Sequence, residues 1–184
     1  MPRYVALLRA INVGGHVVKM DHLRALFEEL GHSEVTTFIA SGNVLFSAPG
    51  KSGPALERAI EKHLRSSLGY EVATFVRTHA EVQQAASYEP FAAAIMAKPY
   101  HGLYVSFLRD APSAAVRRAV EALRTPTDEL HVHQRELYWL SRLPFGDSKL
   151  GGPQLEKILG MPATMRSVTS LRKLAAKCGA APPK

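Results

Sequence analysis

The chain has 184 residues, of which 46% are hydrophobic and 21% charged, an ordinary composition for a globular protein. At this length the chain buries enough surface to fold without a metal or disulfide. Its one cysteine, Cys178, excludes an intramolecular disulfide and a multi-cysteine metal site. The apolar stretches are too short to span a bilayer, and the first residues lack a signal-peptide pattern, so we expect a cytoplasmic protein.

The net charge of +7 is concentrated near the C-terminus. Residues 142–184 carry 8 basic and 2 acidic side chains, whereas residues 1–141 carry 15 basic and 14 acidic ones. A basic segment of this kind suits nucleic acid, a phosphorylated ligand or an acidic partner. A solvated helix face followed by a loose tail accounts for it equally well.

The first half of the chain reads as β-α-β-β-α-β. Helices are indicated by apolar residues at three- and four-residue spacing and by terminal glycines, and strands by short apolar runs. The predicted strands are 3–10, 35–40, 44–47 and 72–77, and the predicted helices are 20–30 and 54–68. A glycine-bearing loop, 12–16, follows the first strand, and Ser41-Gly42-Asn43 joins the middle two as a tight turn.

The same order recurs after a connecting helix that begins at a capping box, Thr78 to Glu81. A final amphipathic helix, capped by Thr169, closes the chain. We therefore predict an α+β fold of two ferredoxin-like βαββαβ halves packed together, with a connecting helix and a C-terminal helix. The predicted divisions are a first half 1–77, a connecting helical segment 78–101, a second half with the closing helix 102–178, and a frayed tail 179–184.

Two sequence blocks carry a family resemblance. The first is Arg9-Ala10-Ile11-Asn12-Val13-Gly14-Gly15 with Lys19-Met20, Leu23 and Ser41-Gly42-Asn43-Val44, and the second is Ser148-Lys149-Leu150, Leu155-Glu156-Lys157 and Ala163-Thr164-Met165-Arg166. The chain resembles the bacterial family called domain of unknown function 1697. The resemblance implies paired ferredoxin-like subdomains and no established activity. Where this chain has Ala10 the family usually has glycine, and after the matching arginine it tends to have Asn-Trp-Asn-Thr.

Topology places a candidate ligand site at one end of the first sheet. In a βαββαβ unit, the loop after the first strand and the turn between the second and third strands lie at the same end. Backbone amides near a helix N-terminus favour an anion or a polar ligand. The candidate ligand-binding residues of this half are Asn12, Gly14, Gly15, Lys19, Ser41, Gly42 and Asn43.

The alternative is that these residues serve the backbone alone. The glycines would then allow tight turns, and Asn12 and Asn43 would cap backbone groups. The glycines match neither a dinucleotide-binding fingerprint nor a P-loop.

The second block adds three candidates, Ser148, Lys149 and Arg166. Ser148 and Lys149 are adjacent and diverge on a helix, so they are poorly placed to share a proton, and Ser148 suits a turn or a cap. Lys149 suits an anion contact because Gly151-Gly152-Pro153 offers amides at a helix start. Arg166 reaches the same ligand if the last strand packs nearby.

Metal and general acid–base chemistry have little support in the sequence. His131 and His133 share one face of a strand, but no third ligand is evident, so we predict no metal site. Tyr104, Tyr138 and Trp139 are the aromatic residues that an RNA-binding sheet would use, but the strands are apolar on both faces, which favours a core role.

Three functions remain open. The leading hypothesis is the binding of a small anionic or nucleotide-like ligand at the 12–15 loop and the 41–43 turn, with or without catalysis, assisted by Lys149 and Arg166. The second is a nucleic-acid-binding module that uses the basic C-terminal segment. The third is an interaction scaffold without a ligand. The sequence names no cofactor, substrate, reaction or oligomeric state.

Overall fold

The computed structural model describes residues 1–39, 42–50 and 53–179. Ser41 and all of the predicted frayed tail after Gly179 lie outside these residues. The chain divides into two compact units, Met1–Gln84 with Leu174–Lys184, and Ala85–Lys173. Among the described residues, no helix is both long enough and apolar enough to cross a membrane.

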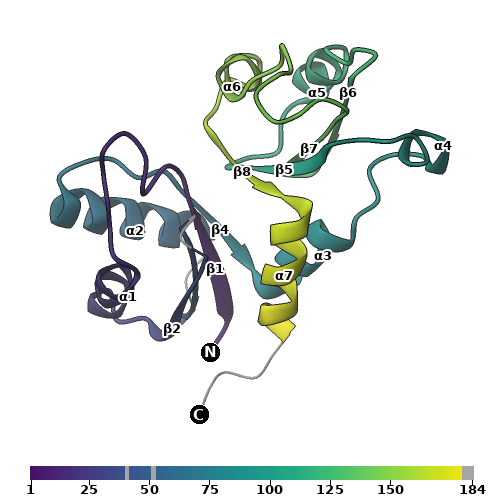
Figure 1. Cartoon of the computed structure of the whole chain (residues 1–184). Helices are drawn as coiled ribbons and strands as arrows, with labels where there is room; N and C mark the ends of the chain where they lie inside the picture. Colours follow the sequence, from purple (N-terminus) through teal and green to yellow (C-terminus); the bar gives the residue numbers. More distant parts are fainter. Residues whose placement is uncertain (40–41, 51–52, 180–184) are drawn as a thin grey trace. The chain divides into compact units, whose positions relative to one another are not determined.

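The first unit is a four-stranded antiparallel sheet with two helices (Figure 1). The strand order is β2-β3-β1-β4. Its elements are β1 (Arg3–Leu8), α1 (Met20–Glu29), β2 (Ser33–Phe38), β3 (Asn43–Ser47), α2 (Gly53–Leu68) and β4 (Thr74–Thr78). The helix α3 (His79–Ser87) follows, and its residues up to Gln84 belong to this unit, as does α7 from Leu174 onward.

The second unit repeats this plan with the strand order β6-β7-β5-β8. Its elements are α4 (Ala93–Met96), β5 (Gly102–Leu108), α5 (Ala114–Glu121), β6 (Asp128–His133), β7 (Glu136–Ser141), α6 (Gly152–Leu159), β8 (Ala163–Ser167) and the start of α7 (Val168–Gly179). The predicted α+β class with two βαββαβ halves is confirmed.

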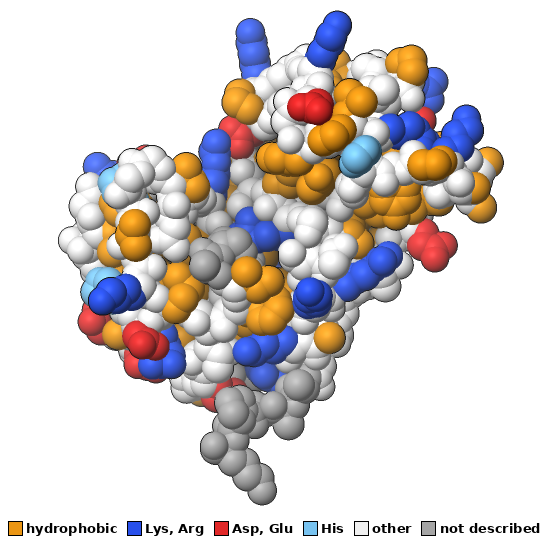
Figure 2. All heavy atoms as spheres, viewed as in Figure 1, with side chains coloured by type: hydrophobic (Ala, Val, Ile, Leu, Met, Phe, Trp, Pro, Cys, Tyr) orange, Lys and Arg blue, Asp and Glu red, His pale blue; other side chains and the backbone are white. Residues whose placement is uncertain are grey.

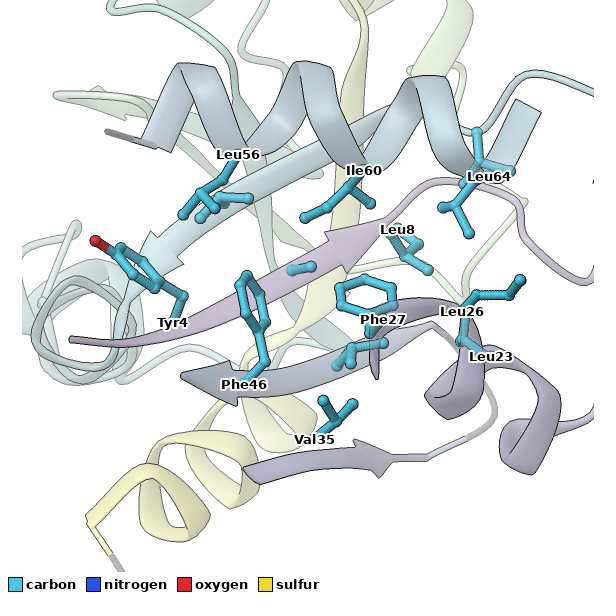
Figure 3. Packing of buried hydrophobic residues seen from close by; sticks show 14 of the residues in the cluster. Tyr4, Leu8, Leu23, Leu26, Phe27, Val35, Phe46, Leu56, Ile60 and Leu64 are labelled. Carbon is cyan, nitrogen blue, oxygen red and sulfur yellow. The ribbon is translucent and has the colours of Figure 1, made fainter. Parts of the chain in front are cut away.

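The core of the first unit lies between the sheet and its two helices (Figure 3). Leu56, Ile60 and Leu64 recur every four residues, so they form one stripe along α2, and all three are fully buried. Opposite them, alternate residues of β1, among them Tyr4 and Leu8, point from the sheet into the same cluster. Each such side chain contributes about 1.5–3 kcal/mol through burial, before the entropy of ordering is subtracted.

The central strands are buried on the other face of each sheet as well. Val5 and Leu7 alternate with the core residues of β1, and both have no exposed surface. All residues of β3 and of β7 are buried. Tyr138 and Trp139 on β7 are only 1% and 3% exposed, so the aromatic side chains of this strand are core residues, as predicted.

Helix glutamates bond to N–H groups along the edges of both sheets. An edge strand presents unpaired donors that invite pairing with another chain, and a carboxylate satisfies such a donor from within. The bonds run from Val76 N to Glu57 at 2.8 Å, Thr74 N to Glu61 at 2.9 Å, Val132 N to Glu121 at 3.0 Å and Ala163 N to Glu156 at 2.9 Å.

The helix caps agree with the sequence in one case and differ in the other. At α3, Thr78 Oγ1 accepts the N–H of Glu81 at 3.2 Å, and the Glu81 carboxylate accepts the N–H of Thr78 at 2.7 Å, which confirms the capping box. At α7 the prediction of Thr169 as the cap is wrong. The helix begins at Val168, and Ser167 Oγ accepts the N–H of Ser170 at 3.1 Å, because β8 ends at Ser167 and leaves its hydroxyl at the first turn.

Candidate functional site

The loop after β1 lies beside the turn between β2 and β3, as the strand order predicts. The N–H of Leu8 donates to the Gly42 carbonyl at 2.8 Å. Gly42 has a φ of +79°, and a Cβ at this position would lie 2.8 Å from Ile11 Cγ2 and 3.0 Å from Leu8 Cβ. Glycine is therefore required here both for backbone conformation and for close packing.

The two asparagines of the predicted site hold backbone groups. Asn12 Oδ1 accepts the N–H of Val18 at 2.7 Å, which braces the loop across its base. Asn43 Nδ2 donates to the Phe38 carbonyl at 2.9 Å, and Asn43 is 2% exposed. These contacts are the capping role that the sequence left open for both residues, and they shape the loop and turn.

Tyr70 anchors the same loop from the end of α2. Its hydroxyl donates to the Ile11 carbonyl at 3.0 Å. The His16 ring stacks on the Tyr70 ring, with the ring centroids 3.8 Å apart and the planes at 17°. Burial raises the pKa of the Tyr70 phenol, so the hydroxyl remains a donor at neutral pH.

A hollow of about 550 Å³ opens between this loop and the adjoining ends of α1 and α2. Among the described residues, its polar lining has donor-bearing side chains and no carboxylate: His16, Lys19, His22, Ser67 and Tyr70. Lys19 is the N-cap of α1, and its own side chain makes no capping hydrogen bond. The first N–H groups of a helix have no partner within the helix, and its dipole favours negative charge there.

The rim of the hollow is exposed and partly apolar. Gly14 and Gly15 are exposed and have φ values of +70° and +88°, and a Cβ at either position would meet no atom within 4 Å. Val13 and Val17 are 62% and 85% exposed. The acidic Asp21 in the first turn of α1 pairs with Arg24 at 3.1 Å, which offsets its charge near the hollow.

In the second unit, Ser148 belongs to a buried hydrogen-bond network. Its hydroxyl donates to Asp128 at 2.9 Å, and its oxygen accepts the N–H of Leu150 at 3.0 Å. Burial alone would raise the pKa of Asp128, but hydrogen bonds from Trp139, Thr127, Thr125 and Ser148 outweigh it and hold that pKa below its ordinary value. Ser148 therefore occupies a turn position, the role its sequence context favours.

The structure does not bring Arg166 beside Lys149. Lys149 is exposed and precedes Leu150, which packs in the cluster between the sheet and the helices of this unit. Met165 packs on that same cluster, so its neighbour Arg166 points to the opposite face of the sheet. Arg166 is 9% exposed and donates to Thr164 Oγ1 at 2.9 Å, and burial lowers its pKa to about 10.

His131 and His133 share one face of β6, as predicted, and Tyr88 lies against both. The Tyr88 hydroxyl is 3.0 Å from His131 Nε2, and the Tyr88 and His133 rings stack with centroids 4.0 Å apart. In the part of the chain that is described, no group of three His, Cys, Asp or Glu side chains is arranged to hold a metal ion.

Four polar residues at these contacts were not predicted from the sequence. His22, Ser67 and Tyr70 line the hollow, and Tyr88 contacts His131. Because α1 and α2 of a βαββαβ unit run antiparallel, the end of α2 returns to the start of α1, and this topology could have pointed to Ser67 and Tyr70. No local signal marks Tyr88.

Comparison with known proteins identifies a family and a fold. The chain is similar to a solved structure, the conserved bacterial protein SP0830 from Streptococcus pneumoniae, with a TM-score of 0.76 and 22% sequence identity. The match covers 98% of this chain and 99% of the other. No curated protein matches the chain. The model of the family "Protein of unknown function (DUF1697)" matches residues 1–138, a segment that contains the loop, the turn and the hollow. The chain therefore belongs to the DUF1697 family.

Proposed function

We propose that the protein binds a small anionic or nucleotide-like ligand in the hollow of the first unit, at the loop after β1 that packs against Gly42. The observation that carries the proposal is the lining of the hollow. Its charged and titratable groups are Lys19, His16, His22 and Tyr70, and they line the hollow beside the N-terminus of α1. Donors that converge without a carboxylate favour a phosphate or a carboxylate group.

The roles within the site follow from position. Lys19 supplies the positive charge, and the N–H groups of the first turn of α1 with the amides of Gly14 and Gly15 supply neutral donors. The free face of the His16 ring, whose other face rests on Tyr70, suits a planar ring of the ligand. Asn12 and Gly42 keep the loop in place through Val18 and Leu8.

The nucleic-acid alternative has less support. The aromatic side chains of β7 are buried. On the face drawn in Figure 2, Lys and Arg side chains are spread over both units, with hydrophobic and uncharged side chains between them. A backbone-binding surface needs a concentrated basic stripe or patch.

A thermal-shift measurement at low salt tests the proposal, with inorganic phosphate, AMP, ATP and a short single-stranded oligonucleotide as probes. A ligand at 100 times its Kd adds about 2.7 kcal/mol of stability, which raises the Tm of a chain of this size by roughly 5–10 °C. We expect a shift with phosphate or a nucleotide that Lys19→Ala abolishes. Lys62→Ala is the matched control, because Lys62 is an exposed lysine of α2 outside the lining.

Two outcomes would overturn the proposal. A shift with phosphate or nucleotide that survives Lys19→Ala would place the ligand elsewhere. A shift with the oligonucleotide alone, lost at higher salt, would favour the nucleic-acid alternative.

A further inference from the structure

A cluster of aromatic and titratable side chains in the second unit joins the end of α3 to β6. Tyr88 follows α3 directly, and its hydroxyl lies 3.0 Å from His131 Nε2. The Tyr88 ring stacks on the His133 ring, with centroids 4.0 Å apart and planes at 15°. The centroid of the Tyr138 ring lies 5.2 Å from that of Tyr88. These ring contacts fix the direction of the phenolic hydroxyl.

The other ring nitrogen of His131 faces a carboxylate. Glu121 Oε1 lies 3.4 Å from His131 Nδ1, and the same oxygen accepts the N–H of Val132 at 3.0 Å, which holds the carboxylate in position. A carboxylate beside Nδ1 favours the tautomer with its proton on Nδ1. Nε2 is then the acceptor for the O–H of Tyr88.

His131 is suited to accept a proton at neutral pH. Burial lowers the pKa of His131, the charge of Glu121 raises it, and His133 and Arg117 lower it, with a net decrease. The ring is therefore neutral near pH 7, and the lone pair of Nε2 faces the O–H of Tyr88. A nucleophile, a neutral base in contact with it and a group that orients the base form the arrangement that activates side-chain nucleophiles.

We propose that Tyr88 is a nucleophile for acyl transfer, with His131 as its general base and Glu121 as the positioning residue. The cluster is open to a reactant, since Tyr88 is half-buried and the His131 and Glu121 side chains are 33% and 31% exposed. The charged groups facing it are Glu121 and Arg117 on α5 and Glu136 on β7. Two carboxylates against one guanidinium do not form a cationic site for an anionic substrate, which favours the neutral carbonyl carbon of an ester.

The reaction balances without a further reactant. The Tyr88 hydroxyl oxygen forms a bond to the acyl carbon, and the ester bond between that carbon and the alcohol oxygen breaks. The phenolic proton passes to His131 Nε2 and from there to the departing alcohol oxygen. The products are an acylated Tyr88 and a free alcohol.

The test uses the full chain and p-nitrophenyl acetate. We expect a burst of nitrophenolate close to one equivalent and a single acetyl group that peptide mass mapping places on Tyr88. Tyr88→Phe keeps the stacked ring and removes the burst. His131→Gln keeps a hydrogen-bond acceptor without a base and slows the burst by about a hundredfold. Tyr100→Phe, at a 41% exposed tyrosine of the same unit, leaves the burst unchanged.

The pH profile separates a positioning role for Glu121 from a structural one. The rate rises with pH as His131 loses its proton, and Glu121→Gln moves the midpoint to lower pH because the glutamate charge no longer raises the pKa of His131. Circular dichroism establishes that each variant is folded. Acetylation of Tyr100 at the same rate as Tyr88, a burst that is indifferent to His131→Gln in a folded protein, or no labelling of Tyr88 would each overturn the proposal.

Discussion

Tyr4 and Tyr104 occupy the same position in the two sheets. Tyr4 pairs with Phe46 on one side and Thr78 on the other, and Tyr104 pairs with Trp139 and Ser167. The match continues along the strands at four further pairs: Val5 with Val105, Leu8 with Leu108, Arg9 with Arg109, and Arg77 with Arg166. The first and last strands of the two units therefore match in residues as well as in position.

The repeat separates what the fold needs from what the first unit adds. Leu8 N donates to Gly42 O at 2.8 Å, and Leu108 N donates to Arg135 O at the same distance. Between its first strand and first helix, however, the second unit has only residues 109–113, where the first unit has 9–19. Because the second unit forms the same sheet without a glycine-bearing loop, the loop is not required by the fold, which supports a ligand-binding role for it.

Ala10→Gly should stabilise the protein. Ala10 has a φ of +53°, a left-handed conformation that strains a residue with a Cβ. Glycine, the usual residue of the family here, relieves this strain, and we expect the free energy of unfolding to rise by about 0.5–1 kcal/mol in a denaturant titration. Ala59→Gly is the control, because Ala59 lies inside α2 without a positive φ, and glycine there should cost about 1 kcal/mol. A loss of stability in Ala10→Gly would show that the positive φ of Ala10 does not strain the chain.

Gly42→Ala should destabilise the first unit through contact as well as strain. The new methyl group would meet Ile11 and Leu8 at 2.8 and 3.0 Å, in addition to the cost of a φ of +79°. Overpacking costs about 1–3 kcal/mol and the backbone term about 1 kcal/mol more. Gly31→Ala isolates the backbone term, because Gly31 has a φ of +78° with open space around it. If urea titrations show equal losses of unfolding free energy in the two variants, Ile11 and Leu8 move to make room for the methyl group and the overpacking prediction is wrong.

The fold could be predicted because its signals are local. Leu56, Ile60 and Leu64 mark a helix face by spacing alone, and Gly31 and Gly160 end helices in the left-handed conformation. The repeat was predicted from the order of its elements. The matching positions of Tyr4 and Tyr104 became evident only when the strand register aligned them.

The contacts within the sites are long-range, and for that reason the sequence does not contain them in readable form. Tyr70 and Ile11 are 59 residues apart, Tyr88 and His131 are 43 apart, and Ser148 and Asp128 are 20 apart. Asn12 and Asn43 illustrate the same difficulty, since a side chain suited to a ligand is equally suited to a backbone group. The hydrogen bonds of the folded chain distinguish these two roles.

Asp128→Asn should destabilise the second unit by about 2–4 kcal/mol. Asp128 is 2% exposed and accepts hydrogen bonds from Trp139 at 2.8 Å and from Ser148, Thr125 and Thr127 at 2.9 Å each. In asparagine, an NH₂ group replaces one of the two accepting oxygens. Its N–H groups then face the N–H or O–H groups of these partners, which leaves buried donors without an acceptor. Ser148→Ala removes one of the bonds and should cost about 1 kcal/mol.

The stability difference between wild type and Asp128→Asn should depend on pH. The pKa of Asp128 is lower in the folded state than in the unfolded state, so its contribution is complete above about pH 4 and is lost as the pH falls further. The stability difference between wild type and Asp128→Asn should therefore be constant from pH 5 to 7 and shrink below about pH 4. A stability difference that grows as the pH falls would show that folding raises the pKa of Asp128 instead of lowering it.

His79 should make the first unit less stable as the pH falls below neutrality. Its Nδ1 lies 3.1 Å from the Cys178 carbonyl, and burial, with the charge of Arg3, lowers the pKa of the ring despite backbone hydrogen bonds that raise it. The unfolded histidine, with a pKa of about 6.5, binds a proton that the folded ring refuses, so stability is complete above that pH and declines below it by up to about 1.4 kcal/mol per pH unit. His79→Gln, whose amide can still donate to Cys178, should flatten the decline in stability below about pH 6.5 in urea titrations. His22→Gln, at an exposed ring, is the control and should leave the decline unchanged. An unchanged slope in His79→Gln would show that the folded ring accepts its proton freely.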